Sequence, residues 1–270
     1  MNKLKEVGRK PLREALPPGE EAQLLALLSA QDIELAKLAA CWRAFAETSR
    51  AGSLKLYQQL SKTFLDKDAP LLAYDAASAG LKHGPNDLEL RRRQGLALAR
   101  SGAVERANKI ASILYEDGHR DDESLGLLAR THKDLALIAS DRLTRDRHLG
   151  AAFEIYNATY QGSGNYWHGI NAATLSVLRG DFPMAVKLAG EICDQLKIKL
   201  PSAKGEERYW ILATLGEATL IQGRSQDAVA WYKKAVKVGK TITRHTGRIS
   251  QHDLSFAIGQ QLDDVMRTAK

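Results

Sequence analysis

Residues 215–235, with the sequence LGEATLIQGRSQDAVAWYKKA, decide the fold of the chain. Leu215 and Gly216 precede a turn glycine, Gly223, and small or aromatic residues follow at positions 228, 232 and 235. Small residues on both sides of a glycine turn are expected where two helices approach each other closely. The stretch therefore predicts one antiparallel helical hairpin.

The spacing of this hairpin recurs along the chain. Gly180, Phe182 and Ala185 repeat the turn-to-alanine spacing 43 residues earlier. Five units at periods of 34, 34, 44 and 43 residues predict an all-α, tetratricopeptide-like superhelical array of antiparallel helix hairpins with capping helices. The offsets of a tetratricopeptide unit, which is about 34 residues long, are seen earliest at Tyr57, Leu60, Ser61, Phe64, Ala73 and Pro85.

The third unit is longer than the others. From its small residue Ala129 to the next matching alanine, Ala152, there are 23 residues, where the unit needs 12. The 11 extra residues fall around Asp141–Gly150, where charged side chains dominate. They amount to roughly three turns of helix, so we expect an extended or kinked helix pair here.

These patterns divide the chain into three segments. We expect an N-terminal helical cap at residues 1–50, an array of about five repeats at residues 51–240, and a C-terminal tail and capping helix at residues 241–270. The last helix is expected over Leu254–Met266, as a cap on the final repeat.

Composition bounds the function. The 270 residues are 44% hydrophobic and 26% charged, as in ordinary folded proteins. A net charge of +7 favours anionic partners moderately, but no helix shows the basic stripe of a DNA-binding protein, which disfavours nucleic acid.

No apolar run approaches the roughly 18 residues of a membrane span. The basic N-terminus is not followed by the apolar region of a secretory signal. We therefore expect a cytoplasmic protein without a membrane partner.

Patterns of the common catalytic and metal sites are absent from the sequence. There is no Cys-x-x-Cys, no His-Glu-x-x-His and no serine nucleophile elbow. The cysteines Cys41 and Cys193 lie far apart inside apolar helical patterns and are expected to be buried. His168 is interpreted as a core or edge histidine. We therefore expect no catalytic residue, no metal and no cofactor.

The first helix of each unit is expected to line a concave groove, with positions 2, 5, 6, 9 and 12 facing inward. This register predicts a cationic half and a half with two indoles. Arginine suits phosphate or carboxylate, and tryptophan can stack on a base. The candidate ligand-binding residues are Arg92, Arg93, Arg130, Lys133, Asp134, Trp167, Asn171, Thr174, Trp210 and Glu217.

Each candidate also has a purely structural interpretation. The arginines at positions 91–93 could form a solvated helix face, and Arg130 with Asp134 could be a surface pair. The two indoles could pack between units. Glu217 lies among apolar residues, so a groove carboxylate there would need a partner such as arginine or lysine.

The sequence also resembles a known family. The runs Ala129–Asp134 and Gly169–Thr174, followed by Tyr209-Trp210, resemble a divergent tetratricopeptide domain over residues 55–240. It is the TRAF-binding central regulatory region of apoptosis signal-regulating kinases, which has many bacterial relatives. The resemblance implies a regulatory role, since the bacterial relatives are often joined to, or encoded beside, effectors of conflict and antiphage systems. They are proposed to sense a nucleotide-derived signal.

Two hypotheses of different classes follow. In the first, a non-catalytic sensor binds an anionic, nucleotide-derived ligand in its groove and relays a signal to an effector protein or fused effector domain, in bacterial antiviral defence. In the second, the array is a scaffold that binds an acidic or helical peptide of a partner. An RNA-associated adaptor is a third, weaker interpretation. The sequence leaves oligomer formation open.

Overall fold

The computed structural model describes residues 19–30, 33–48 and 52–246, and within these ranges the chain forms twelve α-helices and no strand. This confirms the all-α prediction. The helices are α1 (Glu20–Ser29), α2 (Leu35–Glu47), α3 (Leu54–Asp66), α4 (Pro70–Leu81), α5 (Leu88–Arg100), α6 (Val104–Glu116), α7 (Asp122–Ile138), α8 (Arg142–Ser163), α9 (Tyr166–Leu178), α10 (Phe182–Lys199), α11 (Gly205–Ile221) and α12 (Ser225–Thr246).

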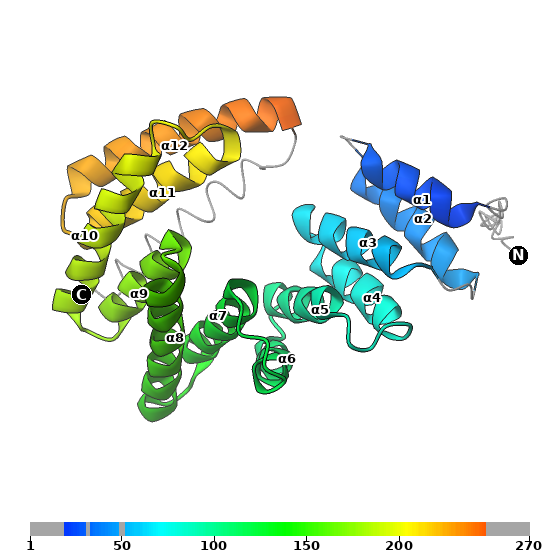
Figure 1. The fold of residues 1–270 in the computed structure, drawn as a ribbon, viewed down its shortest axis with the longest axis horizontal. Coiled ribbons are helices and arrows are strands. Elements are labelled where there is room, and N and C mark those ends of the chain that lie inside the picture. Colours follow the sequence, from blue (N-terminus) through cyan, green and yellow to red (C-terminus); the bar gives the residue numbers. More distant parts are fainter. Residues whose placement is uncertain (1–18, 31–32, 49–51, 247–270) are drawn as a thin grey trace, which may run out of the picture.

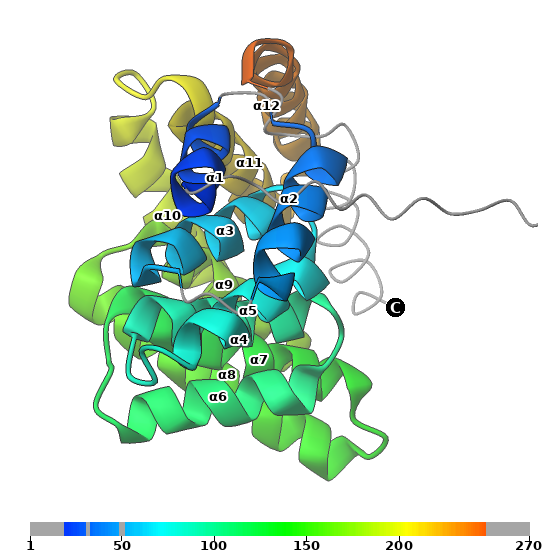
Figure 2. The same cartoon turned by 90° about the vertical axis from the view of Figure 1, so that its right-hand side faces the viewer.

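Helices α3 to α12 pair in chain order into five antiparallel hairpins, as the repeat periods predicted. The hairpins follow one another along an arc, which Figure 1 shows from its flat side and Figure 2 from its N-terminal end. The first helix of a hairpin also packs on the first helix of the next, for example α3 on α5 and α9 on α11. This stacking places the first helices beside one another along the array.

Glycines fix both the turns and the close approach of paired helices. Gly102, Gly180 and Gly223 have φ angles of 83°, 79° and 77°, in the left-handed region that glycine adopts without strain. A Cβ at Gly216 would lie only 2.8 Å from the ring of Tyr232 on α12. The glycines that the repeat pattern identified are therefore required by backbone conformation and by packing.

The extra residues of the third unit lengthen both of its helices. Helix α7 has 17 residues and α8 has 22, whereas α5 and α6 have 13 each. Helix α8 is continuous from Arg142 onward, so the expected extension of this pair is found, and its first turns extend beyond its neighbours in Figure 1.

The five-hairpin array is flanked by the α1–α2 hairpin at its N-terminal end and ends with the long helix α12. The hairpin of α1 and α2 packs on α3 through one apolar cluster that includes Leu24, Trp42 and Leu60. Helix α12 runs to Thr246, past the expected boundary at residue 240. The helix predicted over residues 254–266 lies outside the described residues. Among the described helices, none is both long and apolar enough to cross a membrane.

Candidate ligand-binding groove

Polar contacts join successive first helices of the array. The side chain of Asn165, which caps the start of α9, donates to the carboxylate of Asp122 on α7 at 3.1 Å. The hydroxyl of Thr174 on α9 donates to Glu217 on α11 at 2.5 Å. Each pair is 43 residues apart, which is the local repeat period. The repeat register therefore brings equivalent positions of neighbouring units into contact.

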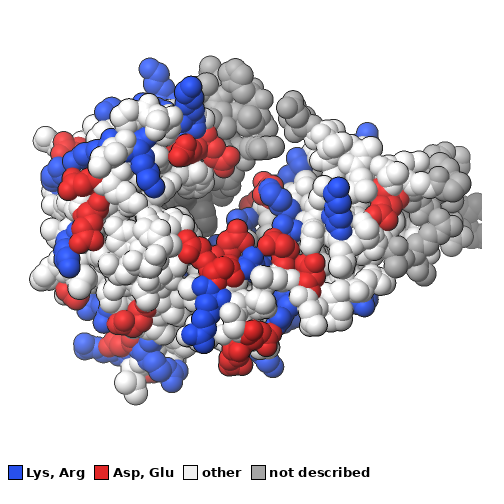
Figure 3. Space-filling view, viewed as in Figure 1, with Lys and Arg blue, Asp and Glu red and all other residues white. Residues whose placement is uncertain are grey.

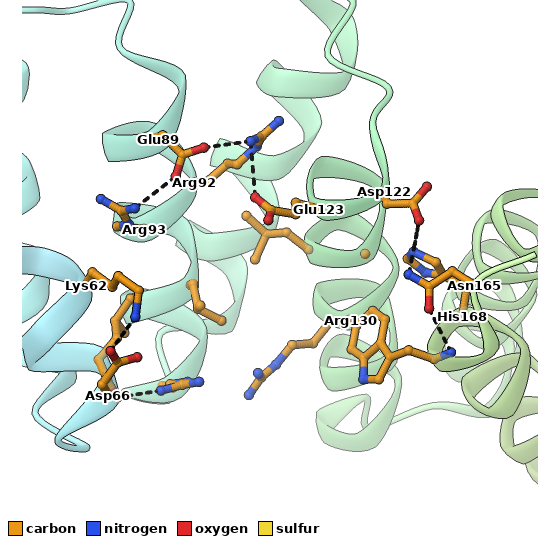
Figure 4. A pocket seen from close by; sticks show the side chains of 16 residues that line it. Lys62, Asp66, Glu89, Arg92, Arg93, Asp122, Glu123, Arg130, Asn165 and His168 are labelled. Atoms are coloured by element: carbon orange, nitrogen blue, oxygen red, sulfur yellow. Dashed lines mark hydrogen bonds and ion pairs between the residues drawn. The ribbon is translucent and has the colours of Figure 1, made fainter. Parts of the chain in front are cut away.

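A pocket of about 460 Å³ lies between α3, α5, α7 and α9 (Figure 4). Its volume is within the range of roughly 300–1,000 Å³ that small-molecule sites occupy. The described residues that line it are Lys62, Leu65, Asp66, Glu89, Arg92, Arg93, Leu96, Arg100, Asp122, Glu123, Gly126, Leu127, Arg130, Asn165, Trp167 and His168.

Arg92 and Arg93 are held in place by neighbouring helices. Arg92 pairs with Glu89 on its own helix at 3.0 Å, with Glu123 on α7 at 3.2 Å and with Asp121 at the start of α7. Arg93 pairs with Glu89 at 3.0 Å and donates to the backbone carbonyl of Gln58 on α3. Figure 4 shows Glu89 between the two guanidinium groups. These arginines therefore connect α3, α5 and α7.

The prediction of a cationic half of the groove is corrected by these contacts. Five cationic side chains line the pocket, against four carboxylates, which leaves a net charge of +1. The carboxylates come from Asp66, Glu89, Asp122 and Glu123. Figure 3 shows acidic and basic side chains intermixed around the hollow of the molecule. The pocket is therefore a surface of mixed charge, in which most cations already have a partner.

Arg130 and Trp167 are the more accessible members of the pocket wall. The side chain of Arg130 is 35% exposed, and its Nε lies 3.6 Å from Asp134, a long contact within one helix. Trp167 is 45% exposed, although its ring also packs edge-on against Tyr156. A Cβ at Gly126 would lie 2.9 Å from the Trp167 ring. Glycine at position 126 therefore makes room for the indole beside α7.

Three polar side chains of the same wall are not among the candidates that the helical register predicts. Asp122 lies 3.5 Å from Nε2 of His168 and also accepts from Asn165, and Figure 4 shows these three side chains next to one another. His168 is 1% exposed, and burial lowers its pKa against the opposing effect of Asp122. A neutral histidine inside the wall agrees with its interpretation as a core or edge residue. The 43-residue spacing of Asp122 and Asn165 is the signal that could have identified this contact.

The remaining candidates lie outside the pocket. Glu217 is 4% exposed, and its direct partner is the hydroxyl of Thr174 and not the cation that the sequence suggested. Burial raises the pKa of Glu217 to about 7, while the Thr174 hydrogen bond and the charge of Lys133 oppose the rise. The amide of Asn171 donates to the backbone carbonyl of Trp167, so it is engaged within its own helix. Trp210 is 45% exposed, as Trp167 is.

The structure therefore separates the predicted surface into two groups. The first group lines the pocket: Arg92, Arg93, Arg130 and Trp167. Lys133 and Asp134, on α7, lie outside the pocket. The second group also lies outside it, on α9 and α11: Asn171, Thr174, Trp210 and Glu217. We call them the pocket group and the α9–α11 group. Four of the ten candidates line this pocket, and a ligand site shared by all ten stays a prediction.

An arc of helical hairpins with a pocket between successive first helices defines a tetratricopeptide-type repeat array. Residues 68–176 match the family model described as Tetratricopeptide Repeats-Sensor. The matched segment runs from just before α4 into the last turn of α9, and it contains every residue of the pocket group.

The crystal structure of a thermophilic TPR protein in Thermus thermophilus is similar to this chain, with 18% sequence identity and a TM-score of 0.61. The similarity covers 78% of this chain and 99% of that chain, and at this identity it concerns the fold. No curated protein matches. Together, the segment match and the structural similarity show that the chain has a tetratricopeptide-type repeat fold.

Proposed function

We propose that this chain is a non-catalytic, cytoplasmic sensor module that binds a small anionic, nucleotide-derived ligand in the pocket between α3, α5, α7 and α9. Binding is relayed to an effector protein or fused effector domain, in bacterial defence. The observation that supports this most directly is the pairing of an accessible guanidinium, Arg130, with an accessible indole, Trp167, in the wall of one pocket. The match to a sensor family over the same residues agrees with it.

The charges of the pocket limit the chemistry of its ligand. Arg92 and Arg93 are occupied by carboxylates, so Arg130 is the cation best able to contact an anionic group. Trp167 offers a surface on which a base can stack. Four carboxylates in the lining can accept hydrogen bonds from sugar hydroxyls or amino groups. A ligand with one or two negative charges, a sugar and a planar ring satisfies all three conditions.

The position of the pocket suggests how binding is relayed. Its walls come from four successive first helices, so a bound ligand contacts three consecutive interfaces of the array. A ligand that fits one arrangement of these helices better than another shifts the balance between the two arrangements. The effector would then recognise the array in its ligand-bound arrangement.

Calorimetry on the full chain with cyclic dinucleotides, NAD derivatives and ADP-ribose species tests the proposal. For a ligand found in this way, Arg130→Ala should weaken binding by about 2 kcal/mol, because a hydrogen bond to a charged group is lost. Trp167→Leu should weaken it by roughly 1–3 kcal/mol through loss of stacking.

Two variants at residues outside the pocket are matched controls. Lys133→Ala removes a cation one turn from Arg130, and Trp210→Leu removes an indole of equal exposure, both outside the pocket. They should leave the affinity within about twofold of wild type. Equal losses in both pairs of variants, or no loss in either pair, would contradict the assignment of the ligand to this pocket.

The scaffold hypothesis remains the second candidate, because the exposed indole of Trp210 lies outside the pocket. A helical peptide laid along the first helices would contact both indoles. Such a partner would lose affinity in Trp167→Leu and in Trp210→Leu alike, whereas a small ligand would respond only to the first.

A further inference from the structure

The extension of the third unit creates a second cleft, which the proposed function does not use. The cleft has a volume of about 800 Å³ and lies between the first turns of α8 and the turn that joins α9 to α10. The described residues that line it are Arg142, Arg145, Asp146, Gly150, Val177, Leu178, Arg179, Gly180 and Phe182. None of them lines the groove pocket, so the two sites are separate.

The inward face of α8 continues into this cleft, where its side chains change from apolar to cationic. Leu149 and Ala152 are buried in the main apolar cluster. Two helical turns earlier on the same face, seven residues back in each case, stand Arg142 and Arg145. Arginine at these positions keeps the face open to solvent, because a charged side chain resists burial by apolar neighbours. The first turns of α8 therefore carry arginines on the face that carries buried apolar side chains in the rest of the helix.

The arginines of the cleft differ from those of the groove in their partners. Within the described residues, no carboxylate lies within ion-pair distance of Arg145 or Arg179. The guanidinium of Arg179 is instead oriented over the ring of Phe153, 4.4 Å from its centroid. Arg142 pairs with Asp146 at 3.3 Å, but both side chains are more than half exposed, so the pair contributes little.

Apolar side chains lie next to these cations. Phe182 lines the cleft and is 54% exposed, and Leu178 adds to its apolar wall. Two carboxylates also belong to this region: Asp146 lines the cleft, and Asp181 follows the lining residue Gly180 in the sequence. They would repel the continuous phosphates of a nucleic acid, whereas a peptide can place single acidic and apolar side chains between them.

We propose that this cleft, formed by α8 and the α9–α10 turn, is a docking site for an acidic segment of a partner protein. Carboxylates of the segment pair with Arg145 and Arg179, and an apolar side chain beside them packs on Phe182. The site acts independently of ligand binding in the groove. It gives the array a protein-binding surface at the extended second helix of the third unit.

Selection from a library of short random peptides displayed on phage, with the full chain as bait, tests this proposal. Wild type should enrich peptides that combine aspartate or glutamate with a large apolar residue. Charge reversal in Arg145→Glu plus Arg179→Glu should weaken an enriched peptide at least about tenfold in fluorescence anisotropy, since two charge-assisted contacts become repulsive. Circular dichroism and thermal melting report whether the variants keep their fold.

The matched control is Arg147→Glu plus Lys187→Glu, which changes the net charge equally at exposed positions outside the cleft lining. It should keep the affinity within about twofold of wild type. No enrichment of acidic peptides, or an equal loss in the control, would overturn the proposal. So would tighter binding of a single-stranded oligonucleotide that depends on the same two arginines, because it would assign the cleft to nucleic acid.

Discussion

The two groups of side chains on the first helices each contain a tryptophan at the same repeat position. Trp167 and Trp210 are 43 residues apart and equally exposed, at 45%. Around Trp167 the neighbouring helix contributes Gly126 and Arg130, which leave an open pocket. On the helix of Trp210, Glu217 is instead sealed against Thr174 of α9. The repeat position thus fixes the exposure of the indole, while the facing helix decides whether a hollow remains beside it.

The two groups also differ in what joins their helices. In the pocket group, Arg92 connects α5 to α7 through the partly exposed carboxylates of Asp121 and Glu123. In the α9–α11 group, one buried carboxylate and one hydroxyl make the contact. Exposed ion pairs are weakened by water and salt, whereas a buried acid depends on its protonation state. Stability measurements can therefore distinguish the two groups.

The largest effect on the free energy of unfolding is expected at Glu217 when the pH is changed. Its pKa is raised to about 7 in the folded chain, against 4.5 for an ordinary glutamate. The folded state therefore holds this proton more tightly than the unfolded state. The resulting stabilisation is fully present below pH 4.5 and is lost as pH rises to about 7, by a total on the order of 3 kcal/mol. Urea unfolding of wild type and Glu217→Gln across this range should show the difference between them change by this amount.

Glu207→Gln is the control for this pH dependence, because it alters an exposed acid on the same helix. Its unfolding free energy should follow that of wild type at every pH. If Glu217→Gln and wild type also ran parallel from pH 4.5 to 7, the buried contact would not distinguish the α9–α11 group from the pocket group.

The next largest effect on the free energy of unfolding is expected at Arg92, which belongs to the pocket group. Arg92→Ala leaves Glu89, Asp121 and Glu123 without their shared cation and should destabilise the chain by about 2 kcal/mol. Arg91→Ala is a close match, since its side chain has similar exposure but pairs with Asp117 alone, and it should cost at most about 1 kcal/mol. Equal free energies of unfolding for the two variants would show that the multiple pairing of Arg92 adds nothing.

Most of the fold could be predicted from the sequence, because its signals are local. A glycine such as Gly216 or Gly223 is needed wherever helices touch or the backbone takes a positive φ, and its spacing marks each unit. The helical register then placed Arg130 and Trp167 on one face of their helices, and both line the pocket. The distance between Ala129 and Ala152 also predicts the extra length of the third unit, which α8 shows.

The distribution of charge could not be predicted in this way. The partners of Arg92 include Asp121 and Glu123, at the start of the next first helix, and their distance depends on how tightly consecutive units stack. The burial of Glu217 against Thr174 depends on the same stacking, because the two side chains must come within hydrogen-bond distance of each other. Positions along a helix can be read from spacing, whereas contacts between units follow from the superhelix that all units build together.

The smallest effects are expected at two glycines that each face an aromatic ring, Gly216 on α11 and Gly126 on α7. Gly216→Ala puts a Cβ 2.8 Å from the ring of Tyr232, which is 8% exposed and has little room to move. Overpacking of this kind costs roughly 1–3 kcal/mol, and the better helix propensity of alanine offsets about 1 kcal/mol. We therefore expect a net loss of about 1 kcal/mol in urea unfolding.

Gly126→Ala meets the ring of Trp167 at 2.9 Å, but this indole is half-exposed and can move outward. Its effect on the unfolding free energy should stay within about 0.5 kcal/mol of zero. Because the displaced indole narrows the pocket, the same variant should still weaken ligand binding, whereas Gly216→Ala should not. A reversal, in which Gly126→Ala unfolds the chain more readily than Gly216→Ala, would mean that Trp167 is a packing residue. Trp167 would then not be an open wall of a pocket, and its contrast with the buried carboxylate of Glu217 would not hold.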